Sequence, residues 1–179
     1  DTIEFLLSAG ADVNHSDKSG KTVLFDAIIE GVANINMIDY LIDKGADIDH
    51  RDNNEKTIVD DLVEIILIQQ NNKKTSSRRF YDIVEHEDYI GLLKRMLTHK
   101  PKINIPKKDG RTVIYDVINY NNLELIKTIL NNGCDANIRD INGDTPLSVL
   151  IDEGVKIKRP RDRELFLERL VFLLKFRVD

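Results

Sequence analysis

The candidate functional side chains of this sequence are carboxylates, because three aspartates recur at the same position of a repeating pattern. Each lies four residues after a threonine: Asp26, Asp61 and Asp116. Successive helical units pack about 10 Å apart, which is too far for a retaining acid–base pair and near the limit for an inverting pair. A row of carboxylates instead favours a basic or hydrogen-bond-donating partner. The alternative is that each carboxylate bonds to a neighbouring backbone group or lysine.

Basic residues precede the threonines of the same pattern in three of its four copies. They are Lys21, Lys56 and Arg111, and the fourth copy has Asp144. Together with Lys18 they would form a basic rim beside the carboxylates. Such a surface would suit a partner of mixed charge, or the basic side chains could face the carboxylates of the chain itself.

Two further basic stretches interrupt the pattern, near residues 69–87 and 155–163. Their basic residues are Lys73, Lys74, Arg78, Arg79, Lys156, Lys158, Arg159 and Arg161. Equivalent insertions in stacked repeats lie along one edge, and these two would be about 20 Å apart. We expect either an edge that docks an acidic protein segment, RNA or anionic lipid, or two solvated loops that keep the chain soluble.

Histidine and cysteine form no catalytic pattern, so no enzymatic activity, cofactor or metal is predicted. His15 and His50 are equivalent positions of the repeat. His86 and its acidic neighbours could hold a metal, but no cysteine or second histidine is near. Cys134 replaces an alanine of the repeat and is expected to be a small buried residue, since no nearby histidine could activate it.

Composition narrows the function classes further. The 179 residues carry a net charge of −5, which argues against a general nucleic-acid binder. No apolar run approaches the 18 residues of a membrane span. The single cysteine excludes an intrachain disulfide and fits a reducing compartment. We therefore expect a cytoplasmic (intracellular) protein, with secretion as an effector left open.

The elements that would position these residues belong to an internal repeat of about 33 residues. The sequence Gly-Ala-Asp-Val-Asn at 10–14 recurs in related form at 45–49 and 133–137, and residues 100–104 are a degraded copy. Successive threonines of the pattern lie 35, 55 and 33 residues apart. Apolar residues follow at helical spacing, and we expect each threonine to cap a helix.

This repeat resembles the ankyrin repeat, most closely at residues 10–14 and 145–147. The resemblance covers essentially the whole chain and implies an all-α repeat solenoid of stacked helix–turn–helix units joined by β-hairpin-like tips. Longer connections between the two helices are expected in the second and fourth full repeats. The chain departs from the family at the histidine of the motif, which is replaced by Phe25, Asp60, Tyr115 and Ser148.

We interpret residues 1–179 as a single ankyrin repeat domain. It divides into a partial repeat at 1–16 and full repeats at 17–51, 52–106, 107–139 and 140–179, with the insertions near 69–87 and 155–163. Both terminal helices are rich in apolar residues, so we expect the chain to be part of a longer protein.

The resemblance implies a non-catalytic scaffold that binds a protein partner, whose identity is open, through a concave face and the hairpin tips. One alternative is a targeting module of a larger enzyme or effector whose catalytic domain lies outside this chain. A second alternative is a self-associating structural array.

Overall fold

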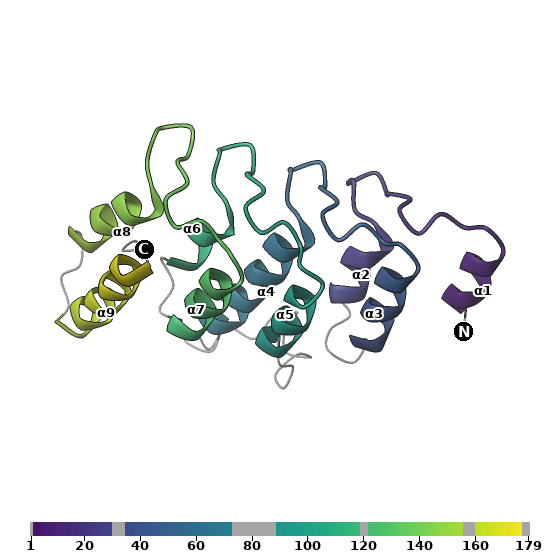
Figure 1. Cartoon of the computed structure of the whole chain (residues 1–179), viewed down its shortest axis with the longest axis horizontal. Coiled ribbons are helices and arrows are strands. Elements are labelled where there is room, and N and C mark those ends of the chain that lie inside the picture. The colour runs from purple at the N-terminus through teal and green to yellow at the C-terminus, as the bar shows by residue number, and fades with distance from the viewer. Residues whose placement is uncertain (1, 30–34, 73–88, 119–121, 156–159, 177–179) are drawn as a thin grey trace.

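Helices packed in pairs, and pairs stacked in a row, make up the computed structural model, which describes residues 2–29, 35–72, 89–118, 122–155 and 160–176. In Figure 1 the turns between successive pairs project along one edge of the row. The helices are α1 (Thr2–Ser8), α2 (Val23–Ile29), α3 (Ile35–Asp43), α4 (Ile58–Asn72), α5 (Tyr89–Leu97), α6 (Val113–Ile118), α7 (Leu123–Asn131), α8 (Pro146–Val155) and α9 (Pro160–Phe176).

Each pair consists of a first helix and a second helix that pack on one another: α2 with α3, α4 with α5, α6 with α7 and α8 with α9. The first helices also contact each other in sequence, α2 with α4, α4 with α6 and α6 with α8. A helix pair cannot bury both apolar stripes by itself, so stacking joins them into one elongated core. The predicted all-α repeat solenoid is confirmed.

Apolar residues at helical spacing form that core. In α7, Leu125, Ile126 and Ile129 are fully buried, and in α5 the same holds for Leu92, Leu93 and Met96. Burying one such side chain contributes about 1.5–3 kcal/mol relative to leaving it in water. The second helices therefore depend on their partners for stability, because an isolated helix of nine residues is marginal in water.

The tips, residues 17–21, 52–56, 107–111 and 140–144, are hairpin-like turns closed by a backbone bond between their first and last residues. In the second tip Asp52 N donates to Lys56 O at 2.9 Å, and the Asp52 carboxylate accepts from the amides of Asn54 and Lys56. Neighbouring tips are joined as well, since Asn53 N donates to Ser19 O at 3.0 Å. The predicted β-like tips are confirmed.

The asparagine that closes the repeat motif links one repeat to the next. The Asn14 side chain donates to Gly45 O at 2.9 Å and accepts from Asp47 N at 2.7 Å. Asn104 makes the equivalent pair of bonds one repeat before Gly133. These bonds satisfy backbone groups that the turns would otherwise leave unpaired.

The prediction that the threonines cap helices is confirmed in two repeats and is wrong in one. The Thr57 hydroxyl accepts from Asp60 N at 3.4 Å, and the Thr145 hydroxyl accepts from Ser148 N at 3.2 Å. The hydroxyl of Thr112 is buried without a hydrogen-bond partner among the described residues. In that repeat the residue three positions on is Tyr115, whose hydroxyl lies 2.7 Å from Ile138 O and 2.6 Å from Asp144 O instead.

Residues predicted as insertions are partly helical. Residues 69–72 extend α4, and residues 160–163 form the first turn of α9, where a proline is well suited because its φ is already helical. Of the eight predicted basic insertion residues, only Arg161 lies in the described part of the chain, where it is exposed on α9. The other seven, together with His86, lie outside the described residues.

Lys100 occupies the position at which the other repeats have a glycine, and it has a left-handed φ of 56°. A left-handed conformation costs an L-residue about 1–2 kcal/mol, while glycine loses more entropy on folding. We expect Lys100→Gly to raise the free energy of unfolding by about 0.5–1 kcal/mol, measured by urea denaturation. The reciprocal control is Gly45→Lys, at φ 91° with open space around it, which should lower stability. Equal stability of Lys100→Gly and the unmodified chain would contradict the prediction.

Candidate functional site

Two hollows lie on the face formed by the first helices and the tips, which we call the first-helix face. The Lys107 hollow has a volume of about 400 Å³ and is lined by Lys56, Asp60, Glu64, Leu67, Ile68, Lys107, Asp109, Arg111, Tyr115 and Asp116. The Tyr89 hollow has a volume of about 300 Å³ and is lined by Lys21, Asp52, Asn54, Lys56, Asp61, Glu64, Ile65, Ile68, Gln69 and Tyr89. Both volumes fall near the range of small-ligand sites.

Helix α4 lies between the two hollows. Both hollows are lined by the same three residues, Lys56 just before the helix and Glu64 and Ile68 within it. It is described over 15 residues, Ile58–Asn72. Its middle part brings half-buried apolar side chains, Ile65 and Ile68, to the walls of the hollows.

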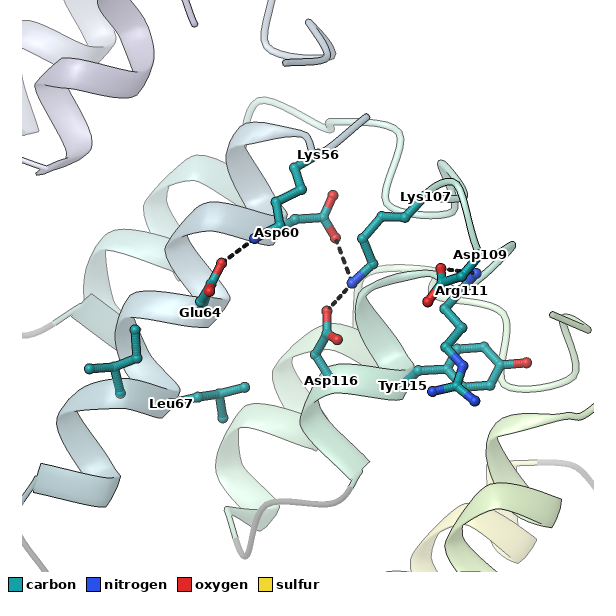
Figure 2. Close-up of a pocket in the computed structure, with 10 residues that line it drawn as sticks. Lys56, Asp60, Glu64, Leu67, Lys107, Asp109, Arg111, Tyr115 and Asp116 are labelled. Atoms are coloured by element: carbon teal, nitrogen blue, oxygen red, sulfur yellow. Dashed lines mark hydrogen bonds and ion pairs between the residues drawn. The ribbon is translucent and has the colours of Figure 1, made fainter. Parts of the chain in front are cut away.

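Lys107 lies between carboxylates of two successive first helices, as Figure 2 shows. Its ammonium forms an ion pair with Asp116 on α6 and lies 4.0 Å from Asp60 Oδ1 on α4. The lysine side chain is only 15% exposed, so water screens these attractions weakly. One ammonium therefore serves two carboxylates.

Asp60 is the most deeply buried acid of the Lys107 hollow, with 5% of its surface exposed. Its Oδ2 accepts from the amide and the hydroxyl of Thr57, at 2.9 and 2.8 Å. Burial raises the pKa of the Asp60 carboxyl above its ordinary value, against the opposing effects of Thr57 and Lys107. The charged form is thus present at neutral pH only at an energetic disadvantage.

The three aspartates predicted from the repeat lie in three different environments. Asp61 lines the Tyr89 hollow and forms an ion pair with Lys21 of the preceding tip. Asp116 lines the Lys107 hollow and pairs with Lys107. Asp26 is exposed on α2 and lines neither hollow. Two of the three carboxylates are therefore already paired with lysines of the chain, as in the alternative expected from the sequence.

Basic tip residues are also engaged. Lys56 pairs with Glu64, and Arg111 donates to Asp140 at 3.0 Å while its guanidinium lies over the Tyr115 ring. Lys18 is exposed, and its backbone carbonyl accepts from the Asn53 side chain. The first-helix face thus has the mixed charge that the sequence indicates.

Cys134 is buried, and burial raises the pKa of its thiol to about 12. A thiol this weakly acidic is almost entirely protonated at neutral pH and is a poor nucleophile. In the described part of the chain, no group of three or more histidine, cysteine or acidic side chains could hold a metal ion. The same residues include no helix long and apolar enough to cross a membrane.

Asp60 and Lys107 were missed as site residues by reasoning from the sequence. Asp60 occupies the position at which the repeat motif has histidine, and this replacement by a charged residue could have identified it. Lys107 is the first residue of a tip, where the other three tips have aspartate. Both are substitutions in an otherwise regular repeat.

Comparison with known proteins identifies the repeat. Residues 1–64 match the family model described as ankyrin repeats (3 copies), and residues 96–150 match that described as ankyrin repeats (many copies). Together the two matches cover more than half of the chain.

Relatives include viral and plant proteins. A putative ankyrin repeat protein of Acanthamoeba polyphaga mimivirus is 33% identical over 35% of this chain and 9% of its own length. A potassium channel of Arabidopsis thaliana is 30% identical over 94% of this chain and 20% of its own length. Ankyrin repeat protein 14 of vaccinia virus (strain Western Reserve) is 34% identical over 35% of this chain and 26% of its own length. The chain thus spans about a quarter or less of each of these relatives.

Proposed function

Because this chain belongs to the ankyrin repeat family, whose members are generally protein-interaction modules and typically non-catalytic, we propose that it is a scaffold that binds a protein partner through its first-helix face and tips. The partner would lie along α2, α4 and α6 and contact the tip residues above them. The proposal includes Asp26, Asp61 and Asp116 together with the basic residues Lys18, Lys21, Lys56 and Arg111.

The observation that supports the proposal is the pair of adjacent hollows on either side of α4. They form a continuous contact area, since three residues line both. Each combines charged residues with apolar side chains, which are Leu67 and Ile68 in the Lys107 hollow and Ile65 and Ile68 in the Tyr89 hollow. Protein interfaces have the same composition, an apolar centre within a polar rim.

Removing the three aspartates tests this surface. We expect the triple variant Asp26→Asn, Asp61→Asn and Asp116→Asn to bind a partner isolated by pull-down at least about threefold more weakly, because charges at an interface mainly set specificity and association rate. The affinity would be measured by surface plasmon resonance with the purified partner.

A matched control removes the same charge from the second helices. Asp43→Asn, Glu124→Gln and Asp162→Asn lie at exposed positions of α3, α7 and α9. This variant should bind the partner as the unmodified chain does. Unchanged binding of the first triple variant, or equal losses in both, would contradict a partner on the first-helix face.

A further inference from the structure

The Lys107 hollow contains more acidic than basic side chains. Its lining includes Asp60, Glu64, Asp109 and Asp116, against Lys56, Lys107 and Arg111. Lys56 pairs with Glu64 inside the hollow, whereas Arg111 donates to Asp140, which lies outside it. Lys107 therefore remains as the one described cation that faces both Asp60 and Asp116.

One oxygen of the buried Asp60 carboxylate has no hydrogen bond within the described part of the chain. Both bonds from Thr57 go to Oδ2, and the nearest cation to Oδ1, the Lys107 ammonium, is 4.0 Å away. That distance permits electrostatic attraction but exceeds hydrogen-bond length. This oxygen is not among the fully buried side-chain atoms that lack a partner, so it is accessible from the Lys107 hollow, where an incoming donor could reach it.

The walls of the hollow would favour a long side chain with a charged end. Leu67 and Ile68 of α4 provide apolar surface in the lining of the hollow. A side chain with a methylene stem can lie on such surface while its charged end makes polar contacts. The volume of about 400 Å³ falls within the range of ligand sites.

We propose that the Lys107 hollow receives a cationic side chain, an arginine in preference to a lysine, from an extended segment of the partner protein. This inference rests on the proposed function and names the chemistry of the partner. A guanidinium has several donors in one plane. It can therefore donate to Asp60 Oδ1 and to Asp116 on the neighbouring helix at once. An anionic guest is disfavoured, because it would meet the excess of carboxylates and compete with existing ion pairs.

The pocket can be tested without the natural partner, using three blocked pentapeptides. The first is acetyl-Ala-Leu-Arg-Leu-Ala-amide, and the others carry lysine or citrulline at the centre. Citrulline has nearly the shape of arginine but no charge, so it isolates the electrostatic contribution. Each peptide is titrated into ¹⁵N-labelled protein and followed by heteronuclear NMR, with Asp116→Asn and Glu124→Gln as variants.

We expect the arginine peptide to bind at least about fivefold more tightly than the citrulline peptide, as for a close charge pair, with lysine between them. Asp116→Asn should reduce arginine binding by a similar factor and should shift the resonances of α4 and α6. Glu124→Gln, on α7, should leave binding unchanged. No saturable binding of the arginine peptide, or equal binding of arginine and citrulline, would overturn the inference. If the triple aspartate variant still lost the natural partner in that case, the proposed function would stand and only the cationic guest would be wrong.

Discussion

Replacing Gly110 with alanine is expected to lower the free energy of unfolding by about 2–4 kcal/mol, combining a left-handed backbone with a lost hydrogen bond. Gly110 has a φ of 76°, a conformation that a side chain disfavours. An added Cβ would also lie 2.8 Å from the backbone nitrogen of Ile141 in the next tip. That nitrogen donates to Asp109 O at 3.2 Å, so relieving the clash would separate the two tips.

A matched control separates the two contributions. Gly143 has a similar φ of 83°, but a Cβ there would meet nothing within 4 Å. Gly143→Ala should therefore lose only about 1 kcal/mol, the conformational part. Thermal denaturation would show the difference, because about 1 kcal/mol shifts the melting temperature by about 2–4 °C in a chain of this size. Equal losses in the two variants would mean that contact between the tips contributes nothing.

Helices and tips could be predicted from the sequence because they depend on local patterns that the repeat presents several times. The apolar spacing of α7 and the glycine after it recur in α3, and each copy supports the others. Where a copy departs from the pattern, prediction was weaker. The insertion predicted near 155–163 includes Pro160, which begins α9, because a proline by itself fits either a loop or the first turn of a helix.

The site was less predictable because it depends on contacts between repeats. Lys107 and Asp60 are 47 positions apart in the sequence and meet only after α4 and α6 stack. Nothing in the local sequence shows which of two adjacent aspartates, Asp60 or Asp61, faces the core. The structure buries Asp60 and leaves Asp61 half-buried beside Lys21, so repeat periodicity alone selected the less buried of the two.

Asp60→Asn is expected to stabilise the fold and to weaken the binding of a cationic side chain in the Lys107 hollow. Because burial raises the pKa of Asp60 in the folded state, the folded chain binds more protons than the unfolded chain between the two pKa values. Unfolding therefore becomes easier as the pH rises through that window. Asparagine can still accept from Thr57 but carries no charge. We expect a gain of about 1 kcal/mol at pH 7, at the low end for neutralising a buried charge because Lys107 already offsets part of the penalty.

The gain should vanish in acid. Below pH 3.8, the ordinary value for aspartic acid, Asp60 is protonated in both states and resembles asparagine. Urea denaturation from pH 3 to pH 7 would therefore show two chains that agree in acid and diverge as the pH rises. A stability difference independent of pH would mean that the carboxylate charge is not the cause.

Binding should move in the opposite direction. Asp60→Asn removes the negative charge of the Asp60 carboxylate from the Lys107 hollow, so affinity for the arginine pentapeptide should fall at least about fivefold at pH 7. Replacing a residue that only stabilises the fold lowers the stability of the protein. Replacing a binding residue that destabilises the fold raises the stability and lowers the affinity for the ligand. NMR titration of the peptide beside urea denaturation of the same sample separates these cases. Loss of stability with unchanged affinity would assign Asp60 to helix capping alone.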